Sequence, residues 1–426
     1  MKLRAVVAAV TLAVLGGLVP ASDAQTKLQF YYPVGVAGPL ARIIDGYVQE
    51  WNRNNPQNQV EPVFAGGYTE AYSKTLAAIR AGTPPDVAIM LSQNLNDIIS
   101  QDIVIPLDEL IAQDAGQVNI DDFFPAFMLN SKQGGKVWAL PFQRSTPVMY
   151  YNKEAFKEAG LDPNHPPQTQ ADLVATARKL VKQEGGRVTR WGLAIPSGGG
   201  VDTWLLEALT IEAGGVLYDP NNSCCKVLLS SPATQAAVQF LRDLGEKDKV
   251  SPPGPVDWGT TSNDFVAGKV AMIYHSTGSL GFIRNNAKFE FGTAFLPKGQ
   301  RYGVPTGGGN VYLFKATPPD RRKAAWEFAK WLTSTDMLAR WSIDSGYVAP
   351  RKSSWETPRM KEYTAKYPQA LTARDQLQYA LAELPVKNII EVKRAIVTAL
   401  QTALTTSQPV AQILAEGQKR VDEILK

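Results

Sequence analysis

The apolar positions in the first hundred residues follow two different spacings. Residues 27–32, 59–64 and 86–91 are short runs rich in aliphatic and aromatic side chains, a composition typical of β-strands. A helix is predicted between the first two runs, because apolar residues recur there at helical spacing: Leu40, Ile43, Ile44, Tyr47, Val48 and Trp51. With a second helix expected over residues 69–81, the order predicts a parallel sheet with covering helices, the start of an α/β fold.

The same alternation continues through the rest of the chain. Further strands are predicted over residues 139–151, 269–275, 288–297 and 311–314, and helices over 171–183, 203–214, 233–246 and 321–332. Residues 306–310, Thr-Gly-Gly-Gly-Asn, are expected to form a glycine-rich turn, and the chain after residue 360 is mostly helical. No low-complexity linker divides the chain, so we expect two lobes joined by several strand crossings.

The N-terminus has the pattern of a secretory signal peptide over residues 1–24. Lys2 and Arg4 precede the apolar run 5–18, and Ser22 and Ala24 offer small residues for cleavage before Gln25. The apolar run is too short and wrongly flanked for a membrane-spanning helix. No cysteine follows it, so a lipid anchor is not expected. The sequence therefore predicts a free protein exported to the periplasm.

Charge and length narrow the class of protein further. The chain has 44 basic and 40 acidic residues, a net charge of +4. Loss of the leader removes Lys2, Arg4 and Asp23, which changes +4 to +3. A charge this small on about 400 residues argues against nucleic-acid or lipid-surface binding, and that length favours two or three domains. We expect a monomer.

Sequence motifs for metal, phosphate-loop and hydrolase chemistry are missing. The two histidines, His165 in a turn and His275 at the end of an apolar run, have no partners at metal-ligand spacing. Cys224 and Cys225 are adjacent, so they are either two small apolar residues or a local bridge, and they cannot link distant segments. No cofactor, metal or catalytic residue is therefore expected.

One long segment carries a family resemblance. Residues 140–163, LPFQRSTPVMYYNKEAFKEAGLDP, resemble the extracytoplasmic solute-binding proteins of ABC importers, in particular their glycerol-3-phosphate-binding branch. Other stretches agree in order: 64–68, 80–86, 276–280, 286–292, 307–309 and 345–347. The resemblance covers essentially the whole mature chain, although the Tyr-Tyr-Asn-Lys-x-Ala-Phe pattern is specific to the broad family and does not name the ligand.

The resemblance implies a two-lobe periplasmic-binding-protein fold of type II-like topology, with three interlobe crossings. The first lobe would comprise residues 26–142 and 292–344, and the second 145–290 and 347–426. The crossings would lie near 142–145, 289–293 and 345–347. A ligand would be enclosed between the lobes by a hinge motion, and the closed form would dock on the permease subunits in the inner membrane.

The resemblance also implies a set of ligand-binding residues. Hydroxyl, aromatic and backbone contacts are expected from Tyr68, Ser145, Trp204, Ser279, Gly308, Gly309 and Tyr347. The glycines would let a ligand approach the backbone closely, a property that a hairpin or bulge also requires.

A phosphate-binding cation is expected on a late helix, where alignment leaves two adjacent candidates. Counting back from Leu400 places Lys393 at the position where the family carries a phosphate-binding arginine. The nearest arginine in this sequence is Arg394. The two lie on opposite sides of the apolar stripe of this helix, so only one is expected to reach the cleft. We favour Arg394 for the bidentate geometry of its guanidinium.

Three positions depart from the glycerol-3-phosphate-binding pattern. Ser92 stands where that branch carries a glutamate for the polyol end, and Gln93 replaces it only with an offset of one residue. Arg144 stands where a small residue is usual, and it either binds phosphate or pairs with an acid across the hinge. Val201 replaces a second tryptophan, which weakens the prediction of a choline-bearing diester.

Two other functions stay open at this point. The same fold could bind a sugar or another polyol, since aromatic side chains suit both. An exported hydrolase would require a buried acid or base pair in the cleft, and the sequence alone indicates no such pair.

Overall fold

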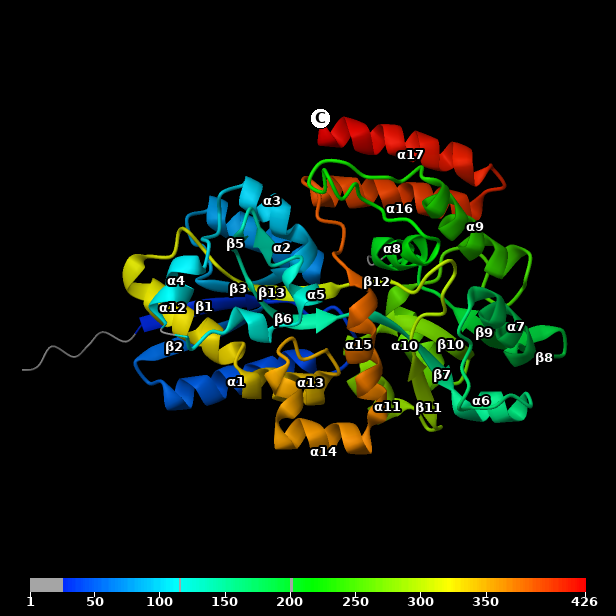
Figure 1. Cartoon of the computed structure of the whole chain (residues 1–426), viewed down its shortest axis with the longest axis horizontal. Helices are drawn as coiled ribbons and strands as arrows, with labels where there is room; N and C mark the ends of the chain where they lie inside the picture. Colours follow the sequence, from blue (N-terminus) through cyan, green and yellow to red (C-terminus); the bar gives the residue numbers. More distant parts are fainter. Residues whose placement is uncertain (1–25, 115, 200–201) are drawn as a thin grey trace, which may run out of the picture.

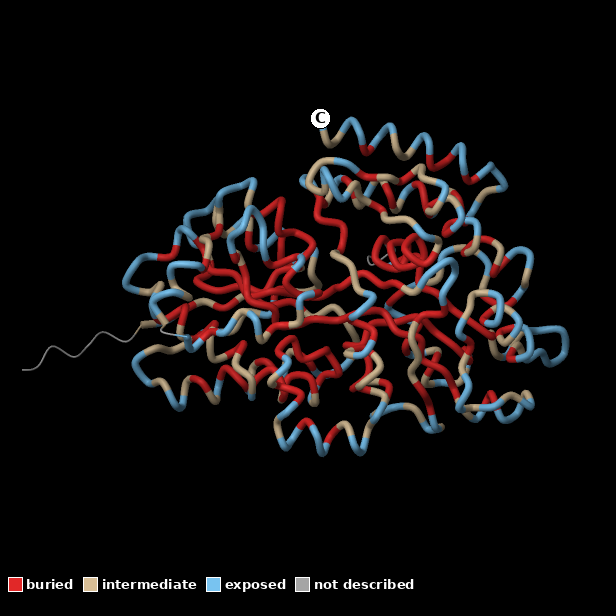
Figure 2. Tube along the Cα trace, in the orientation of Figure 1, coloured by how far each residue is buried: buried red, intermediate tan, exposed pale blue. Residues whose placement is uncertain are grey.

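The computed structural model describes residues 26–114, 116–199 and 202–426 and has two α/β lobes, which confirms the predicted fold class. The predicted signal peptide and Val201 lie outside the described residues. Figure 1 shows the lobes side by side, with the C-terminal helices along one edge of the second. Buried segments follow the strands of both lobes and continue across the junction between them (Figure 2).

The first lobe is built on a five-stranded sheet of order β2-β1-β3-β13-β6. Its strands are β1 (Thr26–Tyr32), β2 (Asn58–Phe64), β3 (Val87–Leu91), β6 (Leu140–Ser145) and β13 (Gly307–Leu313). Strand β1 is parallel to β2 and β3, whereas β13 is antiparallel to β3 and β6. The remaining elements of this lobe are α1 (Leu40–Asn54), α2 (Tyr68–Arg80), α3 (Leu95–Ser100), α4 (Asp108–Gln113), α5 (Pro125–Met128), the hairpin β4 (Lys132–Gln133) and β5 (Lys136–Val137), α12 (Pro319–Leu332) and α13 (Thr335–Ser345).

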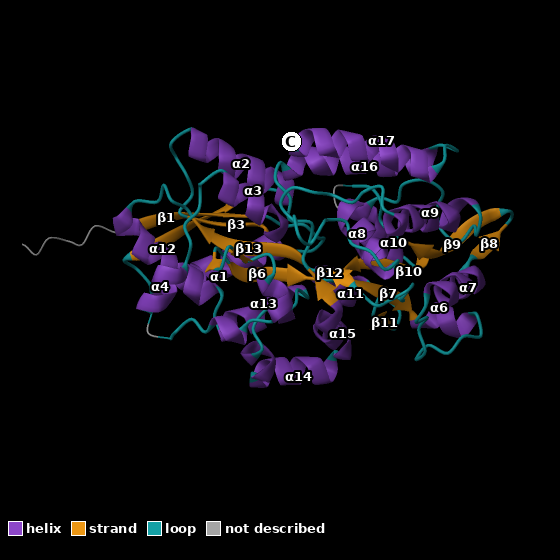
Figure 3. Cartoon of the chain, turned by 45° about the horizontal axis from the view of Figure 1, so that its top comes forward, coloured by secondary structure: helices purple, strands orange, loops and turns teal. Residues whose placement is uncertain are grey.

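The second lobe has its own five-stranded sheet of order β11-β7-β10-β9-β8. Its strands are β7 (Pro147–Asn152), β8 (Lys182–Glu184), β9 (Arg187–Ala194), β10 (Val270–Ser276) and β11 (Phe291–Ala294). The helices that follow or cover them are α6 (Lys153–Glu158), α7 (Gln170–Leu180), α8 (Asp202–Glu212), α9 (Pro232–Glu246), α10 (Trp258–Val266), α11 (Leu280–Asn286), α16 (Ile389–Thr405) and α17 (Val410–Leu425). Figure 3 shows helices around the sheets of both lobes.

Local sequence signals explain where many elements begin. Five of the six apolar positions that predicted α1 are buried, and only Ile43 is partly exposed. Side chains cap the helices of the second lobe: the Asn152 Oδ1 accepts from the Ala155 N–H at 3.0 Å, and the Asp257 Oδ1 accepts from the Thr260 N–H at 2.9 Å. Cys224 and Cys225 are bonded to each other, so the local bridge is the alternative that holds for this pair.

The second crossing differs from the predicted one. Strand β6 continues through Thr146 directly into β7, so one extended segment belongs to both sheets. The predicted first lobe included residues from 292 onward, yet β11 pairs with β7 in the second sheet. The chain returns to the first lobe only at Thr306, after β12 (Val304–Pro305). Alternating hydrophobicity identified β11 as a strand but carried no information on its partner.

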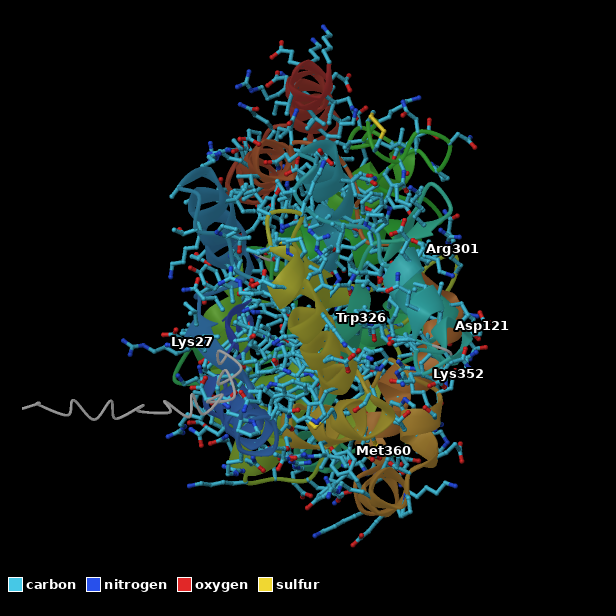
Figure 4. The ribbon with its side chains drawn as sticks, turned by 90° about the vertical axis from the view of Figure 1, so that its left-hand side faces the viewer. Lys27, Asp121, Arg301, Trp326, Lys352 and Met360 are labelled. Carbon is cyan, nitrogen blue, oxygen red and sulfur yellow. A yellow bond between two sulfur atoms is a disulfide. The ribbon has the colours of Figure 1, made fainter. Side chains whose placement is uncertain are left out.

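The third crossing is also more gradual than predicted. The chain turns at Gly346, but residues 350–353 still contact the first lobe. The Phe124 N–H donates to the Pro350 carbonyl at 2.9 Å, and the Lys352 Nζ donates to the Asp121 carbonyl at 2.8 Å (Figure 4). The chain then continues through α14 (Pro358–Lys366), α15 (Leu371–Gln376) and β14 (Ala380–Leu381), and β14 pairs with β12.

The crossing segments are hydrogen-bonded to one another, and we call residues 144–147, 305–308, 346–348 and 380–384 the seam. The Val348 N–H donates to the Arg144 carbonyl at 2.8 Å, and the Thr306 N–H donates to the Leu381 carbonyl at 2.8 Å. Gly307 and Gly308 pair with Ser145 and Arg144 in the β13–β6 ladder. The backbones that join the two lobes therefore hold each other in place.

The glycines predicted as a turn instead begin a strand. Gly307, Gly308 and Gly309 belong to β13, and the register shifts between Gly309 and Asn310, which is a bulge. Gly308 has φ +87°, and a Cβ there would lie 1.7 Å from the Gln143 carbonyl oxygen. Only glycine fits this backbone conformation at this distance.

We expect Gly308→Ala to destabilise the protein far more than a positive-φ glycine elsewhere. Gly82 has φ +76°, and a Cβ added there would have no other atom within 4 Å, so Gly82→Ala tests backbone strain without a clash. Gly82→Ala should lower the free energy of unfolding by about 1–2 kcal/mol, and Gly308→Ala by about 2–4 kcal/mol more. Urea denaturation measures both; equal losses would show that the seam tolerates the extra atom.

Candidate ligand-binding site

A cavity of about 450 Å³ lies between the two lobes, against the seam. Its volume is in the usual range of small-molecule sites. The first lobe contributes residues 34–37, the first turn of α2 and Leu91, and the second contributes parts of α8, α10 and the end of β10. Of the predicted site residues, six line the cavity: Tyr68, Ser145, Trp204, Gly308, Tyr347 and Lys393.

Two tyrosines meet at one side of the cavity. The Tyr68 hydroxyl donates to the Gln143 Oε1 at 3.1 Å and lies 3.3 Å from the Tyr347 hydroxyl. Burial raises the pKa of Tyr347 to about 12 and raises that of Tyr68 well above its usual value. Both hydroxyls therefore keep their protons. The Tyr68 proton is used in the hydrogen bond to Gln143, so this hydroxyl can only accept a hydrogen bond from a ligand. Gly309, predicted to contact a ligand, lies outside the cavity lining and packs beside the Tyr68 ring.

Another part of the cavity lining is aromatic, and we call it the aromatic wall. Trp204 and Trp258 meet edge to face, with ring centroids 6.2 Å apart, and Trp258 stacks on His275 at 3.8 Å. The Trp204 Nε1 donates to the Thr306 carbonyl at 2.9 Å, so the seam orients this ring. The Trp258 Nε1 donates to the Gly35 carbonyl of the first lobe at 3.1 Å. The wall thus joins the two lobes across the cleft.

Arg144 lies behind the cavity and does not line it. Its guanidinium is fully buried over the Phe127 ring, and its Nη1 donates to the Asn310 Oδ1 at 3.2 Å. Burial lowers the pKa of Arg144 to about 10, so it is still charged at neutral pH. Its Nε and Nη2 have no hydrogen-bond partner among the described residues. A direct phosphate contact is therefore not available in this geometry, although its positive charge acts on the site.

The two candidate cations of α16 point to different places. Lys393 lines the cavity, and among the described lining residues it is the one that carries positive charge. Arg394 is exposed and lines a separate groove between α16 and α17. The preference for Arg394 is therefore not supported, because the register of the helix turns the lysine toward the cleft. The bidentate geometry of a guanidinium does not determine which residue binds. The position of each residue around the helix axis determines which side chain faces the cavity.

Ser279 is also directed away from the cavity. Its hydroxyl lies 2.7 Å from the His275 Nδ1, and the serine is fully buried outside the lining. Burial lowers the pKa of His275 to about 4, so the imidazole is neutral at physiological pH. Ser276, three residues earlier, lines the cavity in its place.

Ser92 is buried next to a carboxyl group that belongs to a distant segment. Ser92 lowers the pKa of Glu383, which places the two side chains beside each other, and Glu383 lines the cavity. Gln93, the other candidate for this position, does not line the cavity and donates instead to the Glu207 Oε1 at 3.5 Å. An acidic group is therefore present near position 92, supplied by residue 383.

Glu383 and Glu207 form a buried acidic pair that the sequence did not reveal. Burial raises the pKa of Glu383 to about 7, whereas Lys393 and Arg144 lower it. Burial and the charge of Glu383 raise the pKa of Glu207 well above its usual value. The Glu207 Oε2 accepts from the Leu384 N–H at 2.8 Å. The pair therefore retains protons at pH values where exposed glutamates are ionised.

Weak sequence signals mark the residues that were missed. Glu207 lies in α8, a helix buried along nearly its whole length, where a carboxylate has no exposed face to occupy. Trp258 follows Asp257, the N-cap of α10, and so begins a helix facing the cleft as Trp204 does. Glu383 has no comparable local signal, because its position depends on how the segment after β14 packs against the other segments of the seam.

We expect the free energy of unfolding of wild type, relative to Glu383→Gln, to fall as pH rises from 5 to 8. The folded carboxyl has a raised pKa of about 7 and holds its proton through a range in which the unfolded carboxyl, with an ordinary pKa of 4.5, has lost it. The folded state then binds more protons, so raising the pH destabilises it. Glutamine cannot ionise and avoids this loss.

The expected change in the difference between the two proteins is roughly 2 kcal/mol over this pH range. Chemical denaturation at both pH values measures it. The comparison cancels His275 and the other titrating groups that do not interact with Glu383, whereas Glu207, whose pKa the charge of Glu383 raises, contributes to the measured difference. A constant difference across the range would contradict the raised pKa.

Comparison with known proteins places this geometry in a family. Residues 46–369 match the model for bacterial extracellular solute-binding proteins. The sn-glycerol-3-phosphate-binding periplasmic protein UgpB of Yersinia pestis is 26% identical over 423 residues, covering 95% of this chain and 93% of that protein. The Escherichia coli K12 protein of the same name is 25% identical, covering 95% and 94%.

Solved structures agree with the two-lobe fold. UgpB from Mycobacterium tuberculosis, in complex with glycerophosphocholine, has a TM-score of 0.80 at 25% identity, covering 94% of this chain and 98% of that one. Maltose-bound T. maritima MalE3 has the same TM-score at 22% identity, covering 93% and 99%, and shows likeness of fold alone. With its interlobe cavity and this match over most of its length, the chain belongs to the bacterial extracellular solute-binding proteins and is a solute-binding protein of an ABC importer.

Proposed function

We propose that this protein binds a phosphorylated polyol, either glycerol 3-phosphate or a glycerophosphodiester, and delivers it to the permease subunits of its importer. The observation that carries the proposal is Lys393, a cation that faces the cavity. Among the residues that the structure describes, no carboxylate lies within 4.0 Å of its ammonium, so it is available to an anion. The names of the UgpB relatives support the same ligand class.

The other lining groups suit the remaining parts of such a ligand. The first turn of α2, residues 68–70, faces the cavity and offers backbone N–H groups that no helical carbonyl uses. The Ser145 and Ser276 hydroxyls add donors. The indole of Trp258 supplies a flat apolar surface for carbon atoms, as does that of Trp204. One cation and several neutral donors together match a small phosphate ester.

We propose that the protein acts by binding and not by catalysis, in a periplasmic location reached through the predicted leader. Of the buried acids Glu207 and Glu383, Glu383 lines the cavity and Glu207 does not, so the two do not face a ligand as a pair. A Ser–His contact exists at Ser279, but the serine is buried outside the cavity lining and the pKa of His275 is about 4. A base of that pKa is a weak proton acceptor at neutral pH. No helix of the described residues has the length and hydropathy needed to cross a membrane.

A neutral sugar is the second candidate ligand, and one observation favours it. Glu70 and Glu383 both line the cavity, and carboxylates accept hydrogen bonds from sugar hydroxyls while opposing a phosphate. The aromatic wall suits a sugar ring as well. Dependence of binding on the phosphate group distinguishes this candidate from the proposed ligand.

We expect Lys393→Gln to weaken binding of glycerol 3-phosphate by about 10- to 100-fold, because a charge-assisted contact contributes about 1.5–3 kcal/mol. Arg394→Gln is the matched control: it removes one positive charge from the neighbouring position, which faces the other groove, and should change affinity less than twofold. Calorimetric titration with glycerol 3-phosphate, a glycerophosphodiester, glycerol and maltose measures both variants.

Three results would contradict the proposal. One is wild-type protein that binds maltose but not glycerol 3-phosphate, which favours the sugar. Another is a loss of affinity for glycerol 3-phosphate in Arg394→Gln as large as that in Lys393→Gln. This result would mean that the total positive charge of α16, and not a direct contact from Lys393, attracts the ligand. The third is glycerophosphodiester recovered from the titration in hydrolysed form, which indicates an enzyme.

A further inference from the structure

A carboxyl oxygen beside the cavity lacks the donor that its burial requires. Glu383 is 3% exposed and lines the cavity, and its Oε2 has no hydrogen-bond partner among the described residues. A buried acceptor left without a donor costs about 1–3 kcal/mol. The free oxygen therefore favours a bound molecule that brings a donor to it.

The backbone of this residue is fixed from both lobes. The Glu383 N–H donates to the Asn130 Oδ1 at 2.9 Å, and the Asn130 Nδ2 donates back to the Glu383 carbonyl at 3.0 Å. The next N–H, of Leu384, donates to the Glu207 Oε2 of α8. Since Asn130 belongs to the first lobe and α8 to the second, the side chain starts from a position that both lobes determine. Such preorganisation is what a specificity contact needs.

The groups around the carboxyl indicate what kind of donor it lacks. Lys393 and Arg144 face it from α16 and β6, and their charges lower its pKa, while Glu207 faces it from α8 and Ser92 from the end of β3. Neither cation is within ion-pair distance of it. These two cations thus leave the oxygen unpaired. The Ser92 hydroxyl beside this carboxyl is a donor, but a carboxyl group has further acceptor sites. A phosphate oxygen can accept from this carboxyl only while it is protonated. A ligand hydroxyl donates to a carboxyl in either protonation state.

We propose that Glu383 is the specificity-determining residue for the hydroxyl-bearing end of the ligand, accepting a hydrogen bond from a polyol hydroxyl while the phosphate lies toward Lys393. This inference rests on the proposed function for the phosphate end. It assigns the acidic contact to the segment after β14, because position 92 holds a serine. Under this assignment, the cavity distinguishes glycerol 3-phosphate from alkyl phosphates of the same length that lack hydroxyl groups.

The test compares glycerol 3-phosphate with n-propyl phosphate, which has the same carbon chain and phosphate but no hydroxyl. Isothermal titration calorimetry of the full mature protein should show wild type favouring glycerol 3-phosphate by about 10- to 100-fold. Glu383→Met, similar in size but without an acceptor oxygen, should reduce this ratio to about twofold or less. Glu383→Gln keeps a neutral acceptor and should give an intermediate ratio.

Glu212→Gln is the matched control. Glu212 is a fully buried acid of α8 whose Oε1 also lacks a partner among the described residues, but it does not line the cavity. Its variant should keep the wild-type ratio. Thermal unfolding verifies that each variant is folded, and if Glu383→Met is unfolded, the intermediate ratio of Glu383→Gln carries the test.

The outcomes separate this inference from the proposed function. Equal weakening of both phosphates by Glu383→Met, or an unchanged ratio, overturns the inference and leaves the phosphate assignment intact. If wild type binds maltose and neither phosphate, the proposed function fails. In that case, a tenfold or greater loss of maltose affinity in Glu383→Met would still support Glu383 as the hydroxyl acceptor. Wild type that binds none of the three overturns both.

Discussion

The mutual hydrogen bonding of the crossing segments is the constraint on which the site depends. Strands β6 and β13, the turn at Gly346 and the segment after β14 are far apart in sequence but are held together at the seam. Ser145, Gly308, Tyr347 and Glu383 all lie on it, so their spacing is set by backbone pairing and not by flexible loops.

Burial of charge along the seam couples the ligand to protonation. Arg144 carries a positive charge without solvent contact, and Glu207 and Glu383 retain protons because burial penalises their charged forms. A ligand with negative charge near Lys393 would raise the pKa of both carboxyls further by repulsion. The mixed charge of this region favours a ligand with one anionic end and one neutral, hydroxyl-bearing end.

The sequence predicted the fold well because its signals are local. Helical spacing identified α1, α9 and α12, and the resemblance led to Tyr68, Ser145, Trp204 and Tyr347, which line one cavity. Two failures depended on long-range pairing: the partner of β11, and the strand formed by the glycines at 307–309. The choice between Lys393 and Arg394 depended instead on the phase of α16 relative to the cleft. Glu383 could not be found this way, since nothing near it in sequence indicates which lobes it lies between.

The strand order of the first lobe has a consequence for how the chain acquires its structure. Strand β13 lies between β3 and β6, yet it begins at Gly307, long after β6 ends at Ser145. Because the chain is synthesised from its N-terminus, β3 and β6 are both made before β13. Each therefore has one edge without a strand partner until most of the second lobe has been synthesised. Unpaired strand edges promote aggregation, so we expect the first lobe to be prone to aggregation until β13 has been synthesised.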